Sequence, residues 1–169
     1  RQTLTISNID ISGFTNLTVS LDLAEDDSFD GFEDWDEPDF FSVQARIDGG
    51  AFVDVLRVES SSATSRNTQP RIDTNFDGVG DGTALTDVFQ TFQQSLVGTG
   101  STLDLQLTFD LDAGEEDIAV DNIVVGGDAV AYKLELLHFS DQEANASSFE
   151  NINNLSGVLN ALRAQDAGN

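Results

Sequence analysis

The segment Leu103-Asp-Leu-Gln-Leu-Thr-Phe-Asp-Leu-Asp112 alternates apolar and polar residues without a break. Leucine or phenylalanine occupies every odd position, while aspartate, glutamine or threonine occupies every even one. Such alternation indicates a β-strand with one face buried, because successive side chains of a strand point to opposite sides. The polar face is strongly acidic. The segment therefore predicts a sheet that buries one face against a second layer and presents the other to water.

The same pattern extends over most of the chain. Further strands are expected at residues 2–9, 17–23, 41–47, 52–59 and 118–125. Asp48-Gly49-Gly50 predicts a tight hairpin turn. Residues 88–97 fit both a strand and a helix, and we favour the strand. About seven or eight short strands separated by turns predict a mainly β fold, an antiparallel β-sandwich of the jelly-roll type.

The pattern changes toward the C-terminus. Gly126-Gly127-Asp128 indicates a turn or a short linker, and residues 130–139 form an apolar run that predicts a buried strand. Between Phe149 and Leu162, apolar residues recur every three or four positions, as in an amphipathic helix. We therefore expect two parts, a β-sandwich over residues 1–128 and a strand-loop-helix extension over residues 129–169.

The charge of the chain is strongly one-sided. Its 169 residues include 31 Asp and Glu against 7 Lys and Arg, which gives a formal net charge of −24. This balance disfavours binding to nucleic acid or to an anionic membrane surface, and no apolar run has the length of a membrane span. The acidity is consistent with a solvated surface in salty or calcium-rich water outside the cell, or with carboxylates that bind cations. Because there is no cysteine, disulfides cannot hold the fold, and metal ions are the usual substitute.

One loop has the spacing of a calcium site. In Asp73-Thr-Asn-Phe-Asp-Gly-Val-Gly-Asp-Gly82, oxygen-bearing residues recur at every second position. The pattern D-x-[DN]-x-[DN]-G is typical of calcium loops, which supply several hard oxygen ligands. Ala84 stands where an EF-hand has its bidentate Glu, and no helices flank the loop, so it more closely resembles the calcium loops of thrombospondin type 3 repeats. The expected ligands are Asp73, Asn75, Asp77, the Val79 carbonyl, Asp81 and, in place of the missing Glu, Asp87.

A second acidic stretch runs from Ala24 to Asp39. It is either a solvated loop or part of a second calcium site. For that site, the expected ligands are Asp34, Asp36 or Asp39, together with Asp121 or Asp117. Trp35 lies in the same stretch. Its ring is either a platform on which a sugar stacks or a lid over one end of the sandwich.

Residues 130–165 resemble the start of a calcineurin-like metallophosphoesterase, in particular the secreted 5′-nucleotidase branch. The resemblance rests on Tyr132-Lys-Leu-Glu-Leu-Leu-His-Phe-Ser-Asp-Gln-Glu143 and on Asn160-Ala-Leu-Arg163. His138 and Asp141 match the first two positions of the family's His-x-x-Asp-x-His motif, while Glu143 replaces the second His. The resemblance implies that Asp141 and Glu143 would be metal ligands. Because the chain has one histidine, we expect it not to be an enzyme itself.

Residues 1–128 also resemble calcium-bearing, lectin-like sandwich modules of large secreted bacterial proteins. The features that carry this resemblance are Trp35-Asp-Glu-Pro-Asp-Phe-Phe-Ser-Val43, Asp48-Gly-Gly50 and Ile118-Ala-Val-Asp-Asn-Ile-Val124. We therefore expect a non-catalytic, extracellular, calcium-binding module of a metallophosphoesterase-like protein, with a carbohydrate, a cell-surface polymer or a second copy of itself as partner. One alternative is a structural subunit of an extracellular filament or layer, whose C-terminal strand and helix pack on a neighbour. The other is a fragment of an active phosphoesterase.

Overall fold

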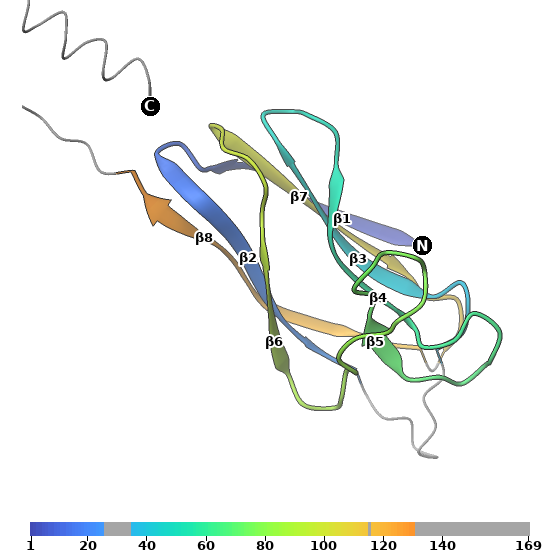
Figure 1. Cartoon of the computed structure of the whole chain (residues 1–169). Helices are drawn as coiled ribbons and strands as arrows, with labels where there is room; N and C mark the ends of the chain where they lie inside the picture. The colour runs from blue at the N-terminus through green and yellow to red at the C-terminus, as the bar shows by residue number, and fades with distance from the viewer. Residues whose placement is uncertain (26–34, 115, 131–169) are drawn as a thin grey trace, which may run out of the picture. The chain divides into compact units, whose positions relative to one another are not determined.

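The computed structural model describes residues 1–25, 35–114 and 116–130 (Figure 1). The chain divides into two units, Arg1–Ala131 and Tyr132–Asn169. The second unit lies outside the described residues, and with it the predicted helix, nearly all of the predicted strand at 130–139, and Asp141 and Glu143. The fold described below is that of the first unit.

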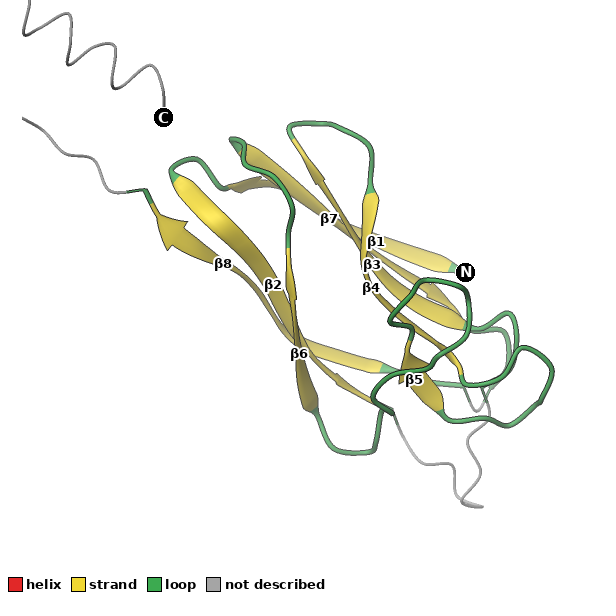
Figure 2. Ribbon diagram, viewed as in Figure 1, coloured by secondary structure: helices red, strands yellow, loops and turns green. Residues whose placement is uncertain are grey.

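Within the described residues, eight strands form two antiparallel sheets (Figure 2). The strand order is β1-β7-β3-β4-β5 in one sheet and β6-β2-β8 in the other. The strands are β1 (Gln2–Asp10), β2 (Phe14–Ala24), β3 (Phe40–Ile47), β4 (Val53–Ser60), β5 (Pro70–Ile72), β6 (Gln90–Ser95), β7 (Thr102–Asp110) and β8 (Ala119–Ala129). The predicted mainly β architecture is confirmed, and residues 88–97 do contain a strand.

Residues 103–110 of the acidic alternating segment lie in β7, which is inside the five-stranded sheet between β1 and β3, while residues 111 and 112 follow the strand. Leu103, Leu105 and Leu107 are buried in the core, as the alternation predicts. Asp104 lies on the other face, where its Oδ2 accepts a hydrogen bond from Nε of Arg46 at 2.8 Å. The leucines therefore lie in the core, while the polar face is itself partly covered, since Thr108 is buried and the Asp104 side chain is only 13% exposed.

The core forms where the inner faces of the two sheets meet. From the three-stranded sheet, β2 contributes Leu17, Val19, Leu21 and Leu23, all buried. The five-stranded sheet contributes residues of β3, β4 and β7 to the same cluster. Full burial of one such side chain contributes about 1.5–3 kcal/mol, so this layer is the main source of stability in the described part. No helix there has the length and apolarity needed to cross a membrane.

The C-terminal end of the first unit differs from the prediction. Gly126-Gly127-Asp128, expected to be a turn or linker, lies inside β8, and the expected boundary at residue 128 falls within that strand. The close approach of β2 favours glycine there. A β-carbon on Gly127 would lie only 3.0 Å from the carbonyl oxygen of Thr15. The pairing of β2 with β8 also shifts register between Thr15 and Thr18, which is the irregularity that glycine accommodates in strands.

Candidate cation-binding site

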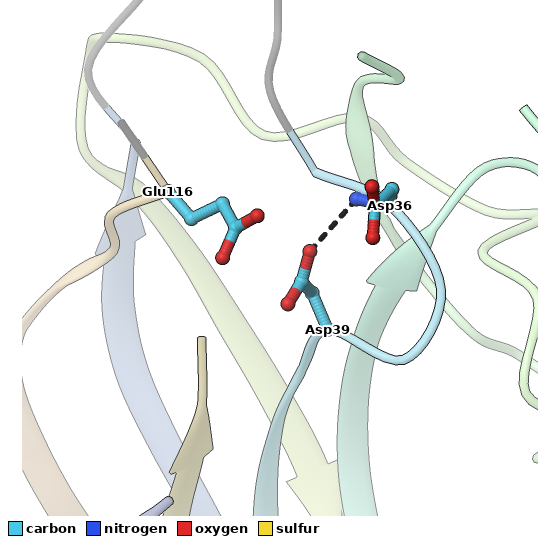
Figure 3. A group of neighbouring side chains, drawn as sticks. All are labelled: Asp36, Asp39 and Glu116. Carbon is cyan, nitrogen blue, oxygen red and sulfur yellow. Dashed lines mark hydrogen bonds between the residues drawn. The ribbon is translucent and has the colours of Figure 1, made fainter. Parts of the chain in front are cut away.

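Three acidic side chains gather at one end of the five-stranded sheet (Figure 3). Asp36 and Asp39 come from the segment that leads into β3, and Glu116 comes from the connection between β7 and β8. Each offers a carboxylate oxygen, and these oxygens all lie within 4.8 Å of one another. Because β3 and β7 are antiparallel neighbours, with Phe40 opposite Asp110, the start of one strand lies beside the end of the other.

A tight turn holds the two aspartates. The Asp39 amide donates to the carbonyl oxygen of Asp36 at 2.8 Å, and the Asp36 amide donates to Oδ2 of Asp39 at 2.8 Å. The turn contains the cis peptide bond between Glu37 and Pro38. The sequence Asp-Glu-Pro-Asp thus folds back on itself and brings both carboxylates toward the same region, as Figure 3 shows.

Glu116 is fixed by the loop that it closes. Its Oε2 accepts hydrogen bonds from the amides of Asp112 and Ala113, both at 2.7 Å. The side chain is buried. The backbone of the β7–β8 connection therefore wraps around one oxygen of this carboxylate and directs the group toward Asp39 across the gap in Figure 3.

Asp39 is the centre of the group. It is only 1% exposed, and its Oδ1 has no hydrogen-bond partner among the described residues. A buried polar atom without a partner costs about 1–3 kcal/mol, so native structures seldom retain one without a reason. The ion pairs formed in the described part lie elsewhere: they join the N-terminus to Asp110, Arg46 to Asp104, and Arg57 to Glu59.

The environment disfavours a negative charge on Asp39. Burial raises the pKa of the Asp39 carboxyl to about 7, against the hydrogen bond from the Asp36 amide, which lowers it. The neighbouring carboxyls of Glu116 and Asp36 raise this pKa further. A cation between the three groups would satisfy the open Oδ1 and cancel the repulsion. The buried acidic cluster can therefore hold a metal ion, and its all-oxygen donor set suits a hard cation.

The structure revises the ligand set expected from the acidic stretch. Asp36 and Asp39 do come together, but their third partner is Glu116, which the sequence did not single out. Asp121 lies in β8 opposite Asp22, and its Oδ1 accepts a hydrogen bond from the Asn122 amide. Asp117 is exposed and lines a different groove, of about 390 Å³. Asp34 lies outside the described residues.

The predicted calcium loop has a closed backbone built around Asp73. This residue is 1% exposed. Its Oδ1 accepts hydrogen bonds from the amides of Asn75, Phe76 and Asp77 at 3.2, 2.7 and 3.4 Å, and its Oδ2 accepts one from Gly78 at 2.9 Å. Gly78 has a φ of +91°, the conformation that the sharp turn at the sixth position of a calcium loop requires. Asp73 thus holds the loop backbone in a compact turn through four main-chain amides.

Other predicted ligands of this loop also stabilise its turns. Asn75 Oδ1 accepts from the Asp77 amide at 3.0 Å, and Asp77 Oδ1 accepts from the Val79 amide at 3.1 Å. Asp81 Oδ1 accepts from both the amide and the hydroxyl of Thr74, at 2.9 and 2.8 Å. Each of these hydrogen bonds closes a turn within the loop. The side chains are therefore ordered near one another by the protein itself.

The loop carboxylates nevertheless differ from the buried cluster. In the described part of the chain, Asp36, Asp39 and Glu116 are the group of three acidic side chains that approach to within 4.8 Å, and Asp73, Asp77 and Asp81 do not meet in this way. Asp87 lines the groove shared with Glu25 and Asp117. A cation at the loop would have to use amide and main-chain oxygens beside the carboxylates.

Trp35 does not serve as an exposed platform for a sugar. The side chain is 1% exposed and belongs to the shared core. Its carbonyl oxygen accepts hydrogen bonds from the amide and hydroxyl of Thr68, at 2.9 and 3.0 Å. Thr68 in turn contacts Ser60 through their hydroxyls at 2.6 Å. The tryptophan therefore anchors the segment before Asp36 to the long β4–β5 connection.

The raised acid pKa values predict an unusual pH dependence for the protein in the presence of a chelator. The pKa of Asp39 is raised from 3.8 to about 7, and burial also raises the pKa of Glu59. Between the unfolded and folded pKa values the native state binds more protons, so these groups lower stability as pH rises. We expect the melting temperature to fall from about pH 5 to about pH 8. Saturating calcium should flatten this decline, whereas a rise across the range would contradict it.

Hydrogen-bonded carboxyls make the protein less stable at acid pH. Hydrogen bonds lower the pKa of Asp22, Asp48 and Asp104, so the stability that they contribute is lost as pH falls below about 4. Circular dichroism melts at constant ionic strength would show both the loss of stability at acid pH and the decline toward pH 8.

The comparison with known proteins adds no assignment: neither a scan against protein-family models nor a search of curated proteins found a match.

Proposed function

We propose that the chain is a non-catalytic, extracellular module whose jelly-roll-type β-sandwich is stabilised by calcium, and that it serves adhesion, ligand binding or assembly. The observation that carries this proposal is the buried Oδ1 of Asp39, which has no hydrogen-bond partner among the described residues and lies with Asp36 and Glu116. A cation there would tie the segment before β3 to the connection between β7 and β8. The cluster thus acts as a clamp at one end of the sheets.

Three features favour calcium as the ion. The candidate ligands are oxygens on irregular loops, and calcium tolerates six to eight such ligands in flexible geometry, whereas magnesium demands a near-ideal octahedron. The Asp73 loop adds a second candidate position, with the backbone shape of a calcium loop. The net charge of −24 and the absence of cysteine also suit a module that works in calcium-rich surroundings outside the cell.

The non-catalytic part of the proposal rests on the position of the cluster. Two of the three carboxylates that could bind a metal, Asp39 and Glu116, are buried, and Asp36 directly follows the core residue Trp35. A buried clamp suits a structural role better than a site that admits substrate. The resemblance of residues 130–165 to a metallophosphoesterase would place the module in a larger secreted protein. A carbohydrate or a cell-surface polymer is the partner class that we propose for it.

Calcium titration tests the proposal. A ligand that binds only the native state adds about 2.7 kcal/mol at a concentration of 100 times its Kd. For a chain of this length that corresponds to a rise in Tm of roughly 5–10 °C. We expect this rise when calcium is added to EDTA-treated protein, and a smaller one with magnesium. Sodium chloride at matched ionic strength is the control. An unchanged Tm at millimolar calcium would remove the ion from the proposal.

A further inference from the structure

The two sheets have four edge strands, β1, β5, β6 and β8. Exposed edges invite pairing with other chains, and proteins usually protect them with charge, irregularity or short length. Three of these edges are protected. β5 has 3 residues, β1 has a register shift between Ile6 and Ile9, and β8 has two register shifts and carries Asp121 and Asp128.

β6 has none of these protections. Its pairing with β2 runs without a register shift from Thr18 opposite Ser95 to Leu23 opposite Gln90. The strand lies in the longest uncharged stretch of the sequence, from Val88 to Leu103. Such a stretch is notable in a chain whose net charge is −24. Among the described residues, no strand pairs with the outer edge of β6.

Exposed apolar side chains flank β6 at both ends. Phe89 before the strand is 50% exposed, Val97 after it is 97% exposed, and Val88 is exposed as well. A groove of about 200 Å³ opens beside its C-terminal end, lined by Leu96, Val97 and residues of β3 and β4. The edge therefore combines unpaired backbone with apolar surface, which are the two features that strand addition uses.

We propose that two copies of this chain associate through β6, antiparallel and about a two-fold axis, to join their three-stranded sheets into one. Side chains on the same face must lie opposite each other in such a pair. Thr91, Gln93 and Ser95 share the outward face. An axis at Gln93 places Thr91 opposite Ser95 of the other copy. It also places Phe89 opposite Val97, so each exposed apolar side chain covers the other.

The register points to a second copy as the occupant of this edge, because a two-fold axis at Gln93 pairs the exposed Phe89 of each copy with the exposed Val97 of the other. Two molecules that each carry −24 repel one another over most approaches. No residue from Val88 to Leu103 is charged, so the two β6 strands bring no charged side chain of their own into the contact. The contact is isologous, so it closes at a dimer. The strand has 6 residues, which predicts a small interface and a dimer that forms at high protein concentration. The association needs no bound cation.

Sedimentation of the full chain tests the dimer. The wild type should shift with concentration from 18.2 kDa toward twice that mass, and added salt should strengthen association because it screens the repulsion. Gln93→Glu places two like charges opposite each other at the axis, so this variant should remain monomeric. Thr5→Glu adds the same charge to the exposed edge strand β1 and should dimerise like the wild type.

Disulfide trapping tests the register. The chain has no cysteine, so Gln93→Cys introduces a single thiol at the proposed axis. Opposed residues of antiparallel strands have Cα atoms about 4.5–5.5 Å apart, a separation that a disulfide can bridge. Oxidation should cross-link Gln93→Cys several times faster than Thr5→Cys. A wild type that stays monomeric, a Gln93→Glu variant that still dimerises, or equal cross-linking of the two cysteine variants would each overturn the proposal.

Discussion

Asp39→Asn is expected to stabilise the chelated protein while greatly reducing its response to calcium. The substitution removes a carboxyl whose charged form is disfavoured by burial and by Glu116 and Asp36. It also supplies an amide N–H close to the Glu116 carboxylate, which is a hydrogen-bond acceptor. Satisfying one buried polar atom is worth about 1–3 kcal/mol at pH 7. Since asparagine is a weaker calcium ligand than a carboxylate, the same change should greatly weaken the clamp.

The measurement is a pair of thermal melts of each variant, in EDTA and in calcium. We expect the Tm of Asp39→Asn to exceed that of the wild type in EDTA, and to change little when calcium is added. Asp54→Asn is a matched control, because Asp54 is exposed and its Oδ1 accepts from Gln44 Nε2 at 2.9 Å, a contact that asparagine can keep. A lower Tm of Asp39→Asn in EDTA, or an intact calcium response, would contradict the proposed role of Asp39.

The strands could be predicted from the sequence because their signal is local. The alternation in residues 103–112 depends only on which face of one strand is buried, and β7 shows that face in the core. The start of β6 and the length of β8 were harder to predict. Gly126 and Gly127 resemble a linker in the sequence, but they lie in β8 because this segment pairs with β2, a long-range contact that no local pattern contains.

The candidate site could be predicted only in part, because its members are far apart in the chain. Asp36 and Asp39 share one turn, so their proximity follows from the sequence. Glu116 joins them because β3 and β7 are antiparallel neighbours, a fact about topology that no local pattern contains. Once the pairing of β3 with β7 is known, the acidic residues that follow β7 become candidates for the same site. The burial of Trp35 likewise depends on the packing of the whole unit.

Asp73→Ala is expected to destabilise the protein even in the presence of a chelator. Both carboxylate oxygens of Asp73 accept backbone amides inside the loop, and the side chain is buried. Hydrogen bonds to a charged group are worth about 1.5–3 kcal/mol each, and part of the loss is recovered when the loop opens to water. We therefore expect a loss of roughly 2–4 kcal/mol in the free energy of unfolding.

Asp77→Ala separates the structural role of the loop from its role in binding. Asp77 is exposed, its Oδ1 accepts the Val79 amide, and its Oδ2 accepts Nδ2 of the exposed Asn75. In EDTA this variant should therefore lose less than about 1 kcal/mol, as measured by urea unfolding. If the loop binds calcium, a small rise in Tm with calcium remains in Asp39→Asn. Asp73→Ala and Asp77→Ala should each lose that part of the rise. If Asp73→Ala were as stable as the wild type in EDTA, the loop would depend on the ion for its shape. If both variants kept the full response, the ion would bind at the Asp36, Asp39 and Glu116 cluster alone.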